Sequence, residues 1–221
     1  MSRETFMARI KLSLSAEPGD GRKAVVQARL QSPPQHPLPM RAQAAGDAAV
    51  ETFASHLEAQ GTVIERVASQ AGVAKVIAAL MTKLHPGIGL VMGADPWLKA
   101  LAWDTVPQLT RPAWREGEIP VAGLSRAIAG IAETGTLVMA SGVDNPASLN
   151  YLPETHIVVI EKAVIGGSME AGLEAARRRS GDLKLPRTLG LISGASRTAD
   201  VGGKLVRGAH GPRTLAVIMV G

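Results

Sequence analysis

Apolar and polar positions along the chain form two alternating kinds of block, one spaced as in helices and one spaced as in buried strands. From Asp47 onward, Val50, Phe53 and Leu57 recur at intervals of three and four residues, and Gly61 follows. This spacing predicts an amphipathic helix, with Asp47 at its amino cap and Gly61 just beyond its end.

Short continuous apolar runs predict buried strands, and segments with helical spacing or turn residues separate them. The predicted strands are residues 62–64, 88–92, 121–124, 136–140, 156–160, 189–192 and 215–220. The predicted helices or turns between them include residues 69–84, 126–132, 146–151 and 169–179. This alternation predicts an α/β fold with a mostly parallel sheet covered on both faces.

The amino-terminal part of the chain has a different composition from the rest. Residues 1–12 have a helical pattern, whereas residues 13–45 are rich in Pro, Gly, Gln and Ser, and Pro33-Pro34 excludes a helix at that point. We therefore expect an N-terminal helix with a proline-rich extended arm over residues 1–45. The α/β domain would then comprise residues 46–221.

The composition indicates a globular protein with an aliphatic core and no membrane span. Of the 221 residues 46% are hydrophobic but only 3% are aromatic, so the core must be aliphatic. No apolar run approaches the roughly 20 residues that span a bilayer, and the first residues lack the apolar segment of a signal peptide. We expect a cytoplasmic protein without a membrane span.

The chain contains no cysteine, which excludes disulfides, a nucleophilic thiol and thiolate-held zinc or iron–sulfur clusters in this chain. The five histidines are scattered, with no pair at a helical ligand spacing. The sequence therefore predicts neither a metal nor a cofactor within this chain.

The net charge of +5 and the pI of about 9.9 raise the question of nucleic-acid binding. The one basic cluster, Arg177–Arg179, ends a helical stretch, where cations stabilise the negative end of the helix dipole. Aromatic residues that stack on bases are scarce. We therefore expect no nucleic-acid partner, and an anionic small ligand or an acidic protein fits the charge equally well.

A first polar motif directly precedes a predicted strand and consists of Glu133, Thr134, Gly135 and Thr136. It would present a carboxylate and two hydroxyls to a cleft, with the glycine allowing close approach of a ligand. The alternative is a turn in which threonine and glycine only satisfy backbone geometry.

A second motif follows the strand at residues 189–192. Its hydroxyls and backbone N–H groups could cradle an anion that Arg197 grips in bidentate fashion. The alternative is a helix cap with an internal ion pair between Arg197 and Asp200. The sequence matches neither a phosphate-binding P-loop nor a dinucleotide-binding turn. The candidate residues are Ser193, Gly194, Ser196, Arg197, Thr198 and Asp200.

A third motif, His210-Gly211-Pro212-Arg213, precedes the last strand. His210 is suited to proton transfer near neutral pH, and Arg213 either binds an anion or marks the start of the strand. Another histidine, His156, enters a predicted strand, and we interpret it as a core or capping residue.

The order of these motifs along the chain makes a geometric prediction. In a parallel sheet the second motif would lie at a carboxyl edge, whereas the other two motifs precede their strands. We predict that the last strand is antiparallel, because the connection from Asp200 is too short for a crossover helix. We further predict that Glu133, Ser196, Arg197 and His210 line one polar cleft.

Taken together, these motifs resemble the lactate utilization protein C family, also called the LUD-domain family. The segments that carry the resemblance are Ala127–Ser141, Tyr151–Ile160, Leu191–Asp200 and Gly208–Val220. The resemblance implies a three-layer α/β/α sandwich similar to glucosamine-phosphate deaminase, ribose-phosphate isomerase and CoA transferases. It also implies the smallest component of a three-protein system that oxidises L-lactate to pyruvate, whose other two proteins carry the iron–sulfur clusters.

Two positions depart from the family pattern: Ala195 stands where proline is common, and Gly202 where an acidic residue is common. Gly202 and the glycine after it make this turn more flexible and remove a polar group. A divergent relative with a different ligand or a weakened site fits these departures.

Two functions follow as hypotheses. In the first, the chain is an accessory subunit that binds iron–sulfur partner proteins and a small carboxylate or phosphate. Arg197 and Arg213 would neutralise the carboxylate, and His210 would accept the proton of the 2-hydroxyl group. Hydrogen bonds would come from Glu133, Thr134, Ser196 and Thr198.

In the second hypothesis, the chain is a stand-alone enzyme for sugar-phosphate isomerisation or acyl transfer, with Glu133 as base or nucleophile. The lack of a clear phosphate loop argues against it. The sequence alone leaves the question of catalysis open, since fold-level analogy says little about chemistry.

Overall fold

The computed structural model describes residues 2–14, 20–32, 37–179, 185–199 and 203–221. By their contacts the residues fall into two compact units, Met1–Pro37 and Leu38–Gly221. The boundary expected after residue 45 stays a prediction. Among the described residues, none of the helices has both the length and the apolar character that crossing a membrane requires.

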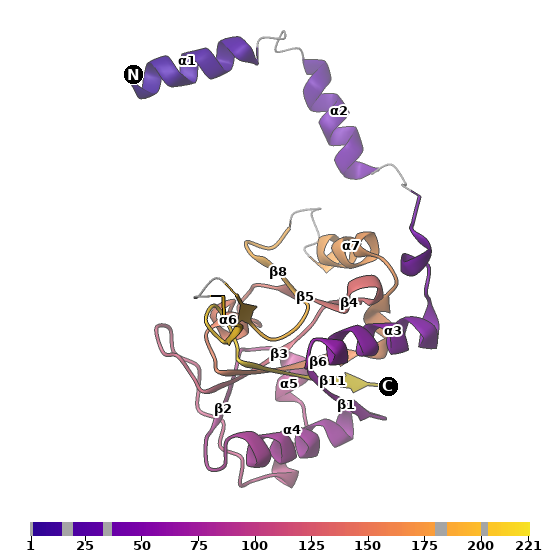
Figure 1. Cartoon of the computed structure of the whole chain (residues 1–221), viewed down its shortest axis with the longest axis vertical. Helices are drawn as coiled ribbons and strands as arrows, with labels where there is room; N and C mark the ends of the chain where they lie inside the picture. Colours follow the sequence, from indigo (N-terminus) through magenta and orange to yellow (C-terminus); the bar gives the residue numbers. More distant parts are fainter. Residues whose placement is uncertain (1, 15–19, 33–36, 180–184, 200–202) are drawn as a thin grey trace. The chain divides into compact units, whose positions relative to one another are not determined.

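The first unit contains two helices, α1 (Arg3–Ser13) and α2 (Asp20–Gln31) (Figure 1). The Ser2 hydroxyl caps α1 by accepting a hydrogen bond from the backbone N–H of Thr5 at 3.2 Å. The expectation of an extended arm is wrong at α2. That stretch contains no proline and is rich in Ala, Arg, Lys, Gln and Leu, which favour helix.

The second unit is built on a parallel five-stranded sheet, hereafter the main sheet. Every neighbouring pair in it is parallel, which confirms the predicted α/β fold with a mainly parallel central sheet. In spatial order its strands are β1 (Val63–Val67), β11 (Thr214–Val220), β6 (Thr155–Glu161), β3 (Ala122–Arg126) and β2 (Leu90–Met92).

The prediction of an antiparallel last strand is wrong, because β11 lies parallel between β1 and β6. That prediction assumed that residues 189–192 and the last strand belong to one sheet. Residues 189–192 instead form a strand of a second sheet. The chain therefore passes from β8 (Leu189–Ile192) in the second sheet to β11 in the main sheet. A crossover helix is not needed, because the two strands do not belong to the same sheet.

The second sheet has four strands and is mostly antiparallel. Its strands in spatial order are β7 (Ile165–Gly166), β4 (Ala129–Ile131), β5 (Thr136–Ala140) and β8 (Leu189–Ile192). The helix or turn predicted at residues 126–132 is wrong, since β4 forms a hairpin with β5 there. At Gly130 a Cβ would lie 3.0 Å from Ile160 and 3.1 Å from Phe53, so close tertiary packing decides this segment.

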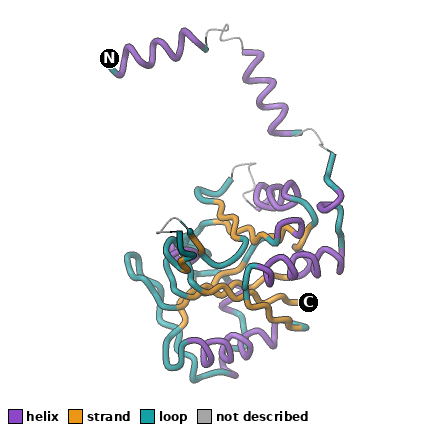
Figure 2. The backbone as a smooth tube through the Cα atoms, in the orientation of Figure 1, coloured by secondary structure: helices purple, strands orange, loops and turns teal. Residues whose placement is uncertain are grey.

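Helices cover both faces of the main sheet, as Figures 1 and 2 show. Helix α4 (Gln70–Leu84) packs on one face. Helix α3 (Gly46–Ala59) and one face of the second sheet pack on the other. Helix α7 (Met169–Arg179) packs on the outer face of the second sheet.

Short elements complete the unit. They are the helices α5 (Pro96–Lys99) and α6 (Ser148–Tyr151), the hairpin of β9 (Arg197–Thr198) with β10 (Val206–Arg207), and 3-10 turns at Met40–Ala42, Trp103–Thr105, Ala132–Thr134 and Lys162–Val164.

Candidate functional site

A cavity of about 250 Å³, hereafter the small cavity, lies at the amino edge of the main sheet. Its walls include His156 at the start of β6 and Leu215 at the start of β11, together with Tyr151 of α6. Residues of the loop after β8 and of the loop before β11 also line it. Because β8 belongs to the second sheet, its carboxyl end meets the amino ends of the main-sheet strands.

The small cavity brings together residues of the second and third sequence motifs. Their predicted site residues that line it are Ser193, Gly194, Ser196, Arg197, His210 and Gly211. Ser196 holds the two motifs side by side. Its backbone N–H donates to the Pro212 carbonyl at 2.8 Å, and its hydroxyl accepts from the His210 backbone N–H at 3.3 Å.

Part of the first motif reaches this cavity through a chain of hydroxyl groups. Thr136, on β5, is buried and hydrogen-bonded to Ser193 at 2.6 Å and to Thr134 at 2.7 Å. Ser193 lines the small cavity. The threonines of the first motif therefore position a cavity residue and do not line the cavity themselves.

Glu133 lies outside the small cavity, so the structure separates it from the three residues with which it was expected to share a cleft. Its carboxylate accepts a hydrogen bond from the backbone N–H of Met169, the first residue of α7, at 2.8 Å. It also pairs with Arg41 at 3.2 Å. A carboxylate at the amino end of a helix satisfies free N–H groups and favours the helix dipole, so Glu133 anchors α7.

Gly135 has a backbone role as well. Its φ of +59° lies in the left-handed region, and a Cβ there would lie 2.5 Å from the Cβ of His56. The turn between β4 and β5 therefore packs directly against α3, and only glycine fits.

The remaining predicted residues occupy different surroundings. Arg197 lies at the cavity and donates a hydrogen bond to the carbonyl of Gln60, at the end of α3. Thr198 is buried on β9, whereas Arg213 is exposed and packs against Gly208. Asp200 and Gly202 lie outside the described residues, and so does the alternative ion pair of Asp200 with Arg197.

Sequence reasoning missed His156, which the structure places in the wall of the small cavity. Its side chain is fully buried, and neither ring nitrogen has a hydrogen-bond partner among the described residues. Burial lowers its pKa to about 3, so the ring is neutral near pH 7, with one N–H donor and one acceptor nitrogen. The available signal was a polar residue inside an otherwise apolar strand.

The small cavity can therefore hold a small polar molecule. The neutral imidazole in its wall has one donor and one acceptor nitrogen, both buried in this structure, and serines, His210 and Arg197 supply further polar groups. Across the described segments of the chain, no group of three or more His, Asp and Glu side chains could hold a metal ion.

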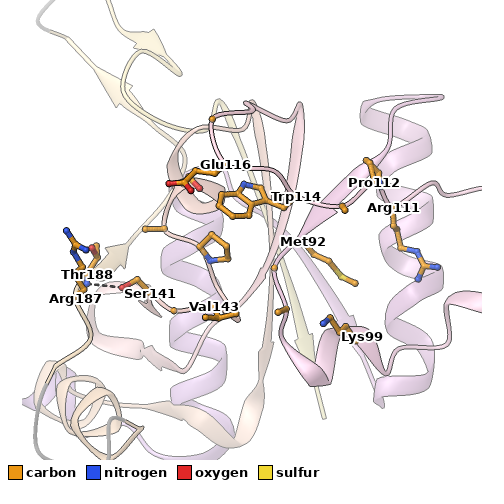
Figure 3. A pocket seen from close by; sticks show the side chains of 18 residues that line it. Met92, Lys99, Arg111, Pro112, Trp114, Glu116, Ser141, Val143, Arg187 and Thr188 are labelled. Atoms are coloured by element: carbon orange, nitrogen blue, oxygen red, sulfur yellow. Dashed lines mark hydrogen bonds between the residues drawn. The ribbon is translucent and has the colours of Figure 1, made fainter.

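A larger cavity of about 1090 Å³, hereafter the large cavity, lies beyond the end of β2 and before the start of β8 (Figure 3). Of the residues that the structure describes, three with cationic side chains line it: Lys99, Arg111 and Arg187. None of the motif residues predicted from the sequence lies there. Its walls come from four separate segments, which sequence patterns do not connect.

Comparisons with known proteins agree with the architecture. The family model described as the LUD domain matches residues 44–220. Similar curated proteins include lactate utilization protein C of Bacillus subtilis, 31% identical over 135 residues (56% of this chain and 56% of that protein). The protein of the same name from Deinococcus radiodurans is 32% identical over 130 residues (57% and 58%). The chain thus spans about half the length of the curated relatives it matches.

A solved structure is also similar to this chain. The crystal structure of a DUF162 family protein from Deinococcus radiodurans superposes with a TM-score of 0.55 at 25% identity. The superposition covers 84% of this chain and 100% of that one. It supports the α/β arrangement described above.

Proposed function

This chain belongs to the LUD domain family, and on that premise we propose that it is a component of a lactate utilization system. The names of several relatives, lactate utilization protein C, support this role. The aligned regions cover 51% to 58% of those relatives. The assignment of a ligand and of partners to this chain therefore rests on the chain's own residues.

In this proposal the chain is an accessory subunit, and iron–sulfur partner proteins carry the electrons released when lactate is oxidised to pyruvate. Iron–sulfur clusters are held mainly by cysteine thiolates, and this chain contains no cysteine. The net charge of +5 suits an acidic protein partner.

The ligand of this subunit is a small 2-hydroxycarboxylate bound in the small cavity. The observation that carries this assignment is the buried imidazole of His156, which has no hydrogen-bond partner among the described residues and lies in the wall that Ser196 and His210 also form. An unsatisfied buried polar group costs about 1–3 kcal/mol, and a ligand hydroxyl or carboxylate in contact with the ring would remove that cost. Arg197 supplies positive charge for the carboxylate.

Glu133 as base or nucleophile of a stand-alone enzyme finds no support in the geometry. Its side chain is 8% exposed and is engaged with Met169 and Arg41. The accessory role makes no use of a reactive carboxylate at this position.

Calorimetric titration of the full chain with L-lactate tests the ligand assignment. We expect saturable binding, with acetate, which lacks the hydroxyl group, binding at least about tenfold more weakly. Ser196→Ala and His156→Leu should each weaken L-lactate binding about tenfold, because each removes a polar partner. His56→Ala, a change at an exposed histidine outside the cavity, is the matched control. Equal affinities in all four proteins would contradict the assignment.

Recovery of the tagged chain from native cells grown on lactate tests the accessory role. Iron–sulfur proteins should co-purify with it in near-stoichiometric amounts. Turnover of lactate by the isolated chain without any partner would contradict the proposal.

A further inference from the structure

Among the described residues, the large cavity is lined by more cationic than acidic side chains. Lys99 ends α5, Arg111 lies in the loop before β3, and Arg187 precedes β8. None of the three forms an ion pair with another described residue. Among the described residues of the wall, Glu116 is the one acidic side chain. Phosphate and carboxylate are the groups that such a set of cations binds.

These cations line opposite walls of one space. In Figure 3, Lys99 and Arg111 lie on one side of the cavity, with the Arg111 guanidinium turned away from Trp114, and Arg187 lies on the other side. Arg111 is held in place by stacking on Trp103, with its guanidinium carbon 4.5 Å from the ring centroid. An elongated anion between the walls can therefore be contacted from both sides.

The rest of the lining is suited to an organic body. Trp114 presents an aromatic ring between the two charged walls (Figure 3), and Met92 and Pro112 add apolar surface. The indole N–H of Trp114 is buried without an acceptor among the described residues. Glu116, two positions along the chain, can accept hydrogen bonds from hydroxyl or amino groups. The volume of about 1090 Å³ lies near the upper end of the range for drug-sized ligands.

Backbone contacts hold part of the walls in place. The Ser141 hydroxyl accepts a hydrogen bond from the Thr188 N–H at 2.9 Å, so its own proton remains available as a donor. The N–H of Ala94 donates to the Val143 carbonyl at 3.3 Å. At Gly93 a Cβ would meet the backbone of Asp144 at 2.2 Å, so the segment after β2 lies directly against the segment after β5.

We propose that the large cavity binds a nucleotide, with its phosphate groups between Lys99, Arg111 and Arg187 and its base against Trp114. This site is separate from the small cavity, and the proposal does not depend on lactate. No described residue lines both cavities, but they lie at opposite ends of β8, and α6 contributes Ser148 to the large cavity and Tyr151 to the small one. A bound nucleotide would therefore contact the same elements that position Ser193 and Tyr151.

Calorimetric titration of the full chain with ATP tests the proposal, alongside tripolyphosphate, which has no base, and adenosine, which has no charge. ATP should bind saturably, more weakly at higher salt, and at least about tenfold more tightly than either fragment. Saturation that is absent up to about 1 mM ATP would overturn the proposal. Tripolyphosphate or adenosine binding as tightly as ATP would overturn it as well.

Variants place the binding in this cavity. Lys99→Gln and Arg187→Gln should each weaken ATP binding about tenfold, because each removes one charge-assisted contact. Trp114→Leu should weaken ATP but leave tripolyphosphate unchanged. The matched control is Lys83→Gln, the same change of charge at an exposed position of α4 outside this cavity. Equal losses of affinity in Lys83→Gln and Lys99→Gln would overturn the proposed site. L-Lactate affinity, measured in the same proteins, keeps this test separate from that of the small cavity.

Discussion

At the scale of single residues, the imidazole of His156 is the most unusual group of the second unit. It is fully buried, it has no hydrogen-bond partner among the described residues, and its pKa is lowered to about 3 by burial. A buried polar group without a partner costs free energy of folding, about 1–3 kcal/mol. Ser196 has the complementary role, because its backbone and hydroxyl fix the loop that carries His210.

The depressed pKa of His156 predicts a dependence of stability on pH. In the unfolded chain the imidazole binds a proton below its ordinary pKa of about 6.5, whereas in the folded protein it stays neutral down to about pH 3. The free energy of unfolding should therefore fall as the pH drops through this window, by about 2 kcal/mol between pH 7.5 and pH 5. Denaturant unfolding at the two pH values measures it.

A variant without a titrating group at this position is the control for that prediction. His156→Gln should reduce the loss of stability between the two pH values by that amount, and His156→Leu provides a second variant if the glutamine side chain is not tolerated. An unchanged pH dependence in both variants would show that other groups cause it.

At the scale of elements, the first motif connects the helices α3 and α7 to the second sheet through its contacts. Its carboxylate anchors the start of α7, its glycine packs on α3, and its threonine hydroxyls lead to the loop after β8. The motif therefore contacts a residue of the small cavity, Ser193, without lining the cavity itself. Residues whose pattern is typical of a binding site can therefore have a structural role next to that site.

Substitution of Gly135 tests the contact between this motif and α3. Gly135→Ala should lower the free energy of unfolding by about 3 kcal/mol, because it combines left-handed backbone strain with a clash against His56. Gly87→Ala is the matched control: its φ is +79°, but nothing lies within 4 Å of the added Cβ, so only about 1 kcal/mol is expected. Chemical denaturation of both variants measures the difference, and equal losses would contradict the packing argument.

At the scale of the whole molecule, the chain combines a compact unit with both cavities and a smaller helical unit. The family match begins at residue 44, within the second unit. The helix α1 of the first unit buries none of its residues. The two units therefore differ in how much burial stabilises them.

Limited proteolysis should distinguish the two parts. We expect the first cuts within residues 13–45, because the described residues there, including those of α2, are almost all exposed and bury little apolar surface. Mass spectrometry of the early fragments identifies the sites. First cuts inside residues 121–220 would contradict this prediction, since β6 and β11 lie there in the middle of the main sheet.

The sequence by itself determined the fold class and the position of most strands. Apolar periodicity is a local property, and buried parallel strands such as β6 and β11 give continuous apolar runs. Sequence patterns also identified the loops at Ser193–Arg197 and His210–Gly211, because Gly, Ser and charged residues cluster there.

Only the tertiary structure decided which of these segments meet. The placement of β8 in a second sheet, the parallel direction of β11 and the separation of Glu133 from the small cavity all follow from non-local pairing. The positions of His156 in the small cavity and of the cations in the large cavity follow from non-local packing as well. Strand register and the packing of distant segments determine which residues are neighbours in space. The local pattern of apolar and polar residues specifies neither of them.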